Sequence, residues 1–177
     1  MRLGIFAGGF KPFHIGHFTR LCQAIDSCDK TYVFYGGAAR SKGSSFNFTE
    51  KDADSVFNIT RRAIKNMYGD RVEVIKSTNP VTSAYDLIID NHDSENVVCV
   101  YGRDDDLSRY YLSYVGTQKE SKYFGNMIKE SRLVFNGKVD TSTLKKHFPN
   151  MSQETLYKFA TFSGTQFRKD LEDQDLD

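Results

Sequence analysis

Short apolar runs alternate with amphipathic stretches along roughly the first hundred residues of the chain. Four of these runs are bounded by glycine or polar residues, and they predict buried β-strands. They span 3–7, 31–35, 72–76 and 97–101. After the first run, apolar residues recur at spacings of three and four, which predicts a helix with one apolar face formed by Phe18, Leu21, Cys22 and Ile25.

Two pairs of polar residues indicate where further helices begin. Thr49 and Asp52 have the spacing of a capping box, so a helix is expected to open at Thr49. Ser83 and Asp86 indicate a second cap, with Leu87 and Ile88 on the buried side of the helix. The helix after Thr49 has an apolar stripe, and Gly69 is expected to end the helix. The stripe consists of Ala53, Val56, Phe57, Thr60, Ala63, Ile64 and Met67.

The second half of the chain has a less regular pattern. The Tyr-rich segment 107–129 contains two helical stretches, and among a subunit contact, a lid and plain core we expect core first. Residues 133–135 predict a fifth strand, and the acidic tail 172–177 is expected to fray. Short helices are expected at 141–148, 152–159 and 165–171.

Strands that alternate with helices predict an α/β fold with a Rossmann-like parallel sheet. We expect about five strands, helices on both faces and further helices at the C-terminal end. A length of 177 residues fits one domain, 1–177. Ligands of such sheets bind beyond the carboxyl ends of the strands. That rule places Gly8-Gly9, Gly36-Gly37 and Gly102-Arg103 on one common edge.

Charge and cysteine content exclude several classes of protein. The net charge of +1 gives no electrostatic basis for binding nucleic acid. Three cysteines without a CxxC pair indicate neither a disulfide framework nor a zinc site, and a reducing, cytoplasmic setting fits them best. The apolar start, residues 1–9, is too short for a signal peptide or a membrane span, so no membrane is expected.

The segment after the first strand carries the most specific chemistry. Gly8 and Gly9 allow the backbone to approach a phosphate closely, and the helix that follows presents free N–H groups to an anion. His14 and His17 lie three residues apart across the start of that helix, so their rings can reach the same side. Gly16 leaves room for a ligand between them. Two imidazoles placed there can donate hydrogen bonds to a polyphosphate.

This segment resembles a known family. Residues 9–17 are similar to the HxGH motif region of the nucleotidyltransferase superfamily. They include Gly9, Phe10, Lys11, His14, Gly16 and His17. In the form GxFxPFHxGH they are most similar to the short nicotinamide-mononucleotide (NMN) adenylyltransferases. The late stretch Ser163-Gly164-Thr165-Gln166-Phe167-Arg168 resembles the family's S-[ST/G]-T-x-x-R motif. Its hydroxyls, N–H groups and guanidinium suit the β- and γ-phosphates.

Two further stretches resemble the same enzymes less closely. The loop 36–51 is similar to their G-S-A…NPFTxxER segment, but Gly37-Ala38 replaces Ser-Ala, the proline is missing, and Lys51-Asp52 replaces Glu-Arg. These departures leave the acceptor open. Arg40 and Lys42 are the loop's candidates for the acceptor phosphate. Family members often carry Gly-x-Asp after the fourth strand, which makes Arg103 and Asp104 further candidates for acceptor binding.

The resemblance implies an enzyme that transfers a nucleoside monophosphate from an NTP to a phosphate-bearing acceptor and releases pyrophosphate. AMP from ATP is favoured, NMN is the example acceptor, and Mg²⁺ would be carried by the NTP phosphates. His14, His17 and Arg168 would stabilise the phosphates, with Lys11 beside them.

The alternatives are a cytidylyltransferase acting on an alcohol phosphate and a nucleotide-binding sensor without catalysis. Class I aminoacyl-tRNA synthetases share the letters HIGH, but this chain is short and lacks their KMSKS-type loop. An oligomer is compatible with the sequence, and its size does not follow from it.

Overall fold

A computed structural model describes residues 1–10, 13–37, 49–115, 121–161 and 169, with side chains through Lys158 in the last helix. Strands and helices alternate from the N-terminus through the fourth strand. The strands are β1 (Arg2–Gly8), β2 (Lys30–Tyr35), β3 (Val72–Lys76), β4 (Val97–Tyr101) and β5 (Leu133–Asn136). The helices are α1 (Ile15–Ser27), α2 (Glu50–Tyr68), α3 (Pro80–Asp90), α4 (Asp104–Tyr110), α5 (Ser121–Lys129), α6 (Thr141–His147) and α7 (Gln153–Thr161), with short 3₁₀ turns at Gly69–Arg71 and Leu112–Tyr114.

All five strands are parallel and lie in the order β3-β2-β1-β4-β5, which confirms the predicted fold class. The chain builds outward from β1 in one direction and then in the other, so the switch point lies between β1 and β4. The backbone N–H of Gly36 donates to the carbonyl of Gly8 at 2.9 Å, and that of Gly37 to Gly9 at 2.8 Å. The glycine turns after β1 and β2 therefore meet at one sheet edge, as predicted.

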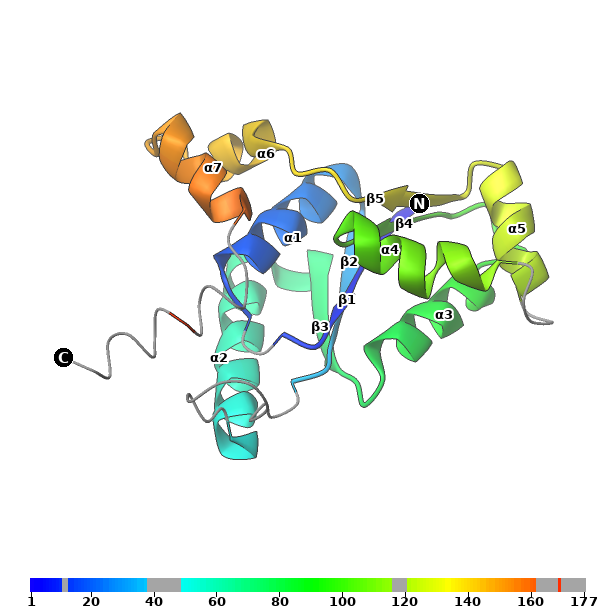
Figure 1. Ribbon diagram of the computed structural model, residues 1–177, viewed down its shortest axis with the longest axis horizontal. Coiled ribbons are helices and arrows are strands. Elements are labelled where there is room, and N and C mark those ends of the chain that lie inside the picture. Colours follow the sequence, from blue (N-terminus) through cyan, green and yellow to red (C-terminus); the bar gives the residue numbers. More distant parts are fainter. Residues whose placement is uncertain (11–12, 38–48, 116–120, 162–168, 170–177) are drawn as a thin grey trace.

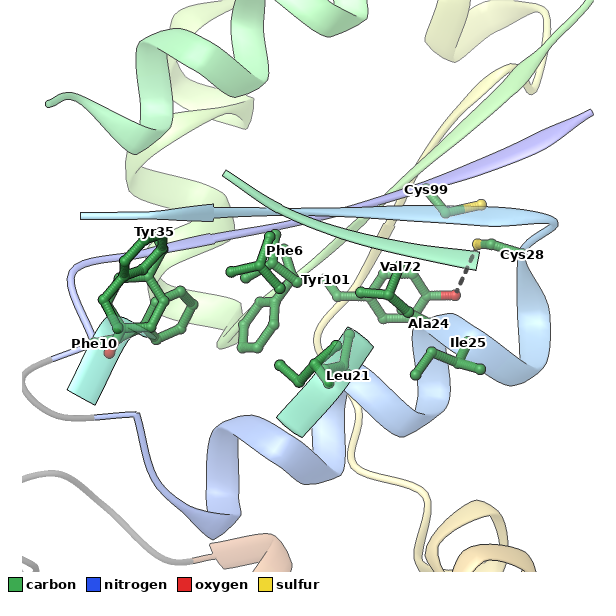
Figure 2. Packing of buried hydrophobic residues seen from close by; sticks show 14 residues of the cluster. Phe6, Phe10, Leu21, Ala24, Ile25, Cys28, Tyr35, Val72, Cys99 and Tyr101 are labelled. Carbon is green, nitrogen blue, oxygen red and sulfur yellow. Dashed lines mark hydrogen bonds between the residues drawn. The ribbon is translucent and has the colours of Figure 1, made fainter. Parts of the chain in front are cut away.

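Helices cover both faces of the sheet, and α6 and α7 lie outside α1 (Figure 1). The core has one half on each face of the sheet. Figure 2 shows the half under α1 and α2, where Phe6 and Tyr101 from the strands meet Leu21 and Ile25 of α1. The other half lies under α3, α4 and α5 and contains Ile5, Phe34, Ala84, Ile88, Val98, Val100, Leu107, Tyr111, Phe124, Met127 and Leu133. The described part of the Tyr-rich segment thus gives one face to the core, while Tyr110 and Leu112 stay exposed.

Helix α2 begins as its capping box predicted. The Thr49 hydroxyl accepts from the N–H of Asp52, the Asp52 carboxylate accepts from the N–H of Thr49, and Gly69 ends the helix with a positive φ of 59°. The predicted apolar stripe was wrong in its last part, because Ala63 is exposed and Met67 is 55% exposed. Tyr68 instead packs against the core there, since the buried face rotates around the helix as it lengthens.

The predicted start of α3 was also wrong. The Asn79 side chain caps this helix by accepting from the N–H of Thr82, and Pro80 occupies its first turn. The Ser83 hydroxyl bonds the Ser77 hydroxyl at 2.5 Å, so it caps nothing. Both signals were present in the sequence, and the Asn-Pro pair was the one that decided the boundary. None of the helices in the described parts of the chain is long and apolar enough to cross a membrane.

Helices α6 and α7 are held on α1 by a small apolar cluster. Leu144, Leu156 and Cys22 are completely buried there. Leu144→Ala is expected to lower the free energy of unfolding by about 2–5 kcal/mol, because it removes buried methyl groups and leaves a cavity. Urea denaturation measures this. The control is Tyr157→Ala on α7, whose side chain is 63% exposed and whose loss should change stability by less than about 0.5 kcal/mol. Equal effects of the two variants would show that this cluster does not stabilise the fold.

Candidate functional site

The turn after β1 is shaped by one residue with unusual backbone geometry. Phe10 has a φ of 48°, which is rare and costly for a bulky side chain. Its ring is buried against Phe6 and Tyr35, with centroids 5.2 and 4.9 Å away (Figure 2). The Phe13 ring also packs against it, with its centroid 5.2 Å away. A Cβ on Gly8 would lie 2.8 Å from that ring, so only glycine fits there. The aromatic packing thus fixes the turn that leads into α1.

His14 and His17 form the N-terminal cap of α1. Nδ1 of His14 accepts from the N–H of Gly16 at 3.1 Å, and Nδ1 of His17 accepts from the N–H of His14 at 3.1 Å. The two rings stack with their centroids 3.7 Å apart, so the prediction that they reach the same side is confirmed. The capping role was not predicted, because histidine is not among the usual capping residues.

The hydrogen bonds of the two histidines define where their protons lie. A nitrogen that accepts a backbone N–H carries no proton, so each neutral ring carries its proton on Nε2. Burial, together with the nearby His14 and Arg20, lowers the pKa of His17 to about 2. The His17 ring is therefore neutral at any working pH. The site offers it as a fixed Nε2–H donor, which can stabilise negative charge without releasing a proton.

The lowered pKa of His17 predicts how stability depends on pH. The unfolded chain binds a proton at this ring below a pKa of 6.5, whereas the folded chain resists it down to about 2. Stability therefore falls as the pH drops below 6.5, by about 1.4 kcal/mol per pH unit from this group. We expect the wild type to lose about 2 kcal/mol more than His17→Asn between pH 7 and pH 5 in urea denaturation. Parallel pH profiles would contradict the buried, neutral state of this ring.

A pocket of about 540 Å³ opens between the ends of β1 and β4, at the switch point of the sheet. This volume is suitable for a nucleotide-sized ligand. Its first wall comes from the β1 turn and α1 and contains Phe6, Ala7, Gly8, Gly9, Phe10, His14, Gly16, His17 and Arg20. Its second wall comes from α3, the end of β4, α4 and the chain after β5, and it contains Pro80, Val81, Tyr101, Gly102, Arg103, Asp106, Leu107, Tyr110, Tyr111 and Val139.

The structure brings most of the predicted site residues that it describes into one pocket and places Asp104 outside it. Gly8, Gly9, Phe10, His14, Gly16, His17 and Arg103 line the same pocket. Asp104 is not among the residues that line it: its carboxylate lies against Gly137, where a Cβ would overlap it. Asp106 lines the pocket instead, and burial, together with Asp105, raises its pKa. Lys11, Arg40, Lys42, Ser163, Gly164, Thr165 and Arg168 lie outside the described residues.

Several pocket residues were not predicted from the sequence. Arg20 had one available signal, because it follows His17 by three residues and so lies next to it on α1. No signal in the sequence marked Pro80, Val81 and Tyr110 as pocket residues. Only the order of the strands in the folded sheet brings α3 and α4 to this edge. Tyr110 is 40% exposed and brings an aromatic ring to the pocket, with the Arg109 guanidinium 5.9 Å from the ring centroid.

Comparisons with known proteins find similarity among solved structures. No family model matches the chain, and no curated protein sequence matches it. Among solved structures, the chain is similar to a bifunctional NMN adenylyltransferase/ADP ribose pyrophosphatase from Francisella tularensis, with 16% identity and a TM-score of 0.48. The match covers 96% of this chain and 52% of that one, so the chain spans about half the length of that protein. At this identity and TM-score the similarity adds no argument about function, which therefore has to come from the site itself.

Proposed function

We propose that this protein is a nucleotidyltransferase that transfers a nucleoside monophosphate, AMP in the favoured case, from an NTP to a phosphate-bearing acceptor such as NMN. One observation carries the proposal: His14 and His17 share a pocket with the Gly8-Gly9 turn and the start of α1. The Nδ1 atoms of both rings are used by the helix cap, and the Nε2–H of His17 remains to bind a ligand. Neutral donors, backbone N–H groups and a helix N-terminus together suit a polyphosphate.

The proposed reaction needs no covalent intermediate with the protein. A phosphate oxygen of the acceptor attacks the α-phosphorus of the NTP in line, the bond from that phosphorus to the bridging oxygen breaks, and pyrophosphate leaves with the electron pair. Positioning the two substrates can supply about 7–11 kcal/mol of the barrier reduction. In the proposal, His14 and His17 stabilise charge around the bridge between the α- and β-phosphates, and Arg168 and the N–H groups near Thr165 stabilise the departing pyrophosphate.

The second wall of the pocket supports a place for the acceptor. Tyr110, Leu107 and Val81 give it an aromatic and apolar surface, which suits the planar ring of an acceptor such as NMN. Arg103 adds a positive charge on the same wall and pairs with Asp105 at 3.6 Å, an exposed pairing that a phosphate can displace. We therefore propose that the acceptor phosphate lies between this wall and the histidines.

Mg²⁺ in this proposal arrives with the NTP. Across the described ranges, no three His, Cys, Asp or Glu side chains are gathered so as to hold a metal ion. Mg²⁺ commonly keeps its waters and binds through substrate phosphates, so a protein cage is not required. The ion would neutralise charge on the triphosphate while the histidines and Arg168 contact its oxygens.

An assay of pyrophosphate release tests the proposed function. ATP or CTP with Mg²⁺ is combined with NMN, nicotinic acid mononucleotide or an alcohol phosphate, and nucleotide products are identified by mass spectrometry. The proposal expects pyrophosphate and a dinucleotide in equal amounts from ATP and a mononucleotide acceptor. Release only with CTP and an alcohol phosphate would favour a cytidylyltransferase. ATP binding without release on any acceptor would contradict catalysis and favour a sensor.

A further inference from the structure

Arg20 lies inside the pocket, one turn beyond His17 on α1. It belongs to neither of the two motifs that suggested the family. Its position next to His17 is close enough for its charge to help lower the pKa of that histidine. The charge of Arg20 therefore contributes to the electrostatic potential at the imidazole of His17.

The guanidinium of Arg20 is fixed to the fold by one of its nitrogens. Nη1 donates to the carbonyl of Gly102 at 2.9 Å and to the carbonyl of Gly137 at 3.0 Å. Gly102 follows β4 and Gly137 follows β5, so this single group joins α1 to the ends of two neighbouring strands. An arginine held in this way loses little side-chain entropy when it binds a ligand.

The remaining donors of Arg20 are available. A guanidinium has five N–H groups, and the two bonds to carbonyls use only those on Nη1. In the described part of the chain, neither Nε nor Nη2 of this residue has a hydrogen-bond acceptor. Burial and the nearby Arg103 lower its pKa, against the opposing effect of Asp104 and Asp106, and an arginine still keeps its charge. A half-buried cation bound to neutral carbonyls favours an anion beside it.

We propose that Arg20 is a phosphate-binding residue of the pocket, anchored to Gly102 and Gly137 through Nη1 and presenting its other N–H groups to a phosphate of the substrate. This inference rests on the proposed function only for the statement that the substrate carries phosphate. The phosphate belongs either to the NTP or to the acceptor, and the binding experiment separates these two sources.

Calorimetric binding measurements test this role without any turnover. The ligands are Mg-ATP, NMN, inorganic pyrophosphate, and the phosphate-free adenosine and nicotinamide riboside. Arg20→Gln should weaken binding of at least one phosphate ligand by about tenfold or more and leave the phosphate-free ligands within about twofold, because it removes a charge-assisted hydrogen bond to the phosphate. Loss with ATP and pyrophosphate assigns the contact to the NTP, and loss with NMN alone assigns it to the acceptor.

Two further variants separate phosphate binding from support of the pocket. Arg20→Lys keeps the charge but not the fork of donors, so its affinities should lie between those of the wild type and Arg20→Gln. Arg62→Gln removes the same charge from the exposed surface of α2 and should change nothing. If Arg20→Gln weakens binding of phosphate-bearing and phosphate-free ligands equally, Arg20 only supports the structure of the pocket and the proposal is overturned. Unchanged binding would overturn it as well. Selective loss of phosphate binding in a protein that releases no pyrophosphate would keep this inference while the proposed function fails.

Discussion

His17→Asn is expected to lower kcat by about 10²-fold or more while the protein stays folded. The asparagine Oδ1 stands where Nδ1 of the histidine stands, so it can still accept the N–H of His14 and preserve the cap of α1. Nothing in asparagine reaches the position of Nε2. The variant therefore removes the Nε2–H donor that we propose for the phosphates and keeps the cap of α1. Steady-state kinetics with circular dichroism as the folding check measures the effect.

His17→Gln is the matched control for this prediction. Its amide nitrogen stands near the position of Nε2, so it keeps a donor toward the pocket, but it loses the acceptor that caps α1. We expect it to retain more turnover than His17→Asn and to lose about 0.5–2 kcal/mol of stability. His17→Ala lacks both groups and should show both losses. Near-normal turnover in the asparagine variant would remove His17 from the mechanism.

Arg168→Ala is expected to lower kcat by about 10²- to 10³-fold, as the loss of one preorganised charge-stabilising donor typically does. The expectation comes from the resemblance of the Ser163-Gly164-Thr165 stretch and Arg168 to the family's late motif. Its guanidinium would act on the departing pyrophosphate, so the loss should appear in kcat as well as in kcat/KM. The matched control is Lys169→Ala, which removes an exposed charge from the next residue and should leave kcat within about twofold.

A double variant tests whether the two ends of the chain act on one group. If His17 and Arg168 stabilise the same transition state, the loss in His17→Asn/Arg168→Ala will be smaller than the product of the two single losses. Fully multiplicative losses would indicate independent effects. Turnover in Arg168→Ala equal to that of the lysine control would mean that the late motif serves as an ordinary helix cap.

The parallel sheet was predictable because its determinants are local. Each strand was a short apolar run ended by glycine or a polar residue, and the alternation with helices allowed few topologies. The edge shared by Gly8, Gly36 and Gly102 followed from that topology. The boundary of α3 failed because two cap patterns lay within one segment, and Asn79 with Pro80 outweighed Ser83.

The candidate site was predictable only where its residues are close in sequence. His14 and His17 lie within four residues, so helix geometry alone brought their rings together. Asp106 entered the pocket instead of Asp104, because the first turn of α4 directs Asp104 toward Gly137. Arg20 and Tyr110 line the same pocket from α1 and α4, and no spacing along the chain indicates that they do so.

A crystal structure with a non-hydrolysable ATP analogue, Mg²⁺ and NMN tests the central claim most directly. The account predicts that the bridge between the α- and β-phosphates lies within hydrogen-bond distance of Nε2 of His14 and His17, while the guanidinium of Arg168 contacts the β- or γ-phosphate. A triphosphate bound elsewhere, or an Arg168 side chain farther away than the nucleotide can span, would contradict it.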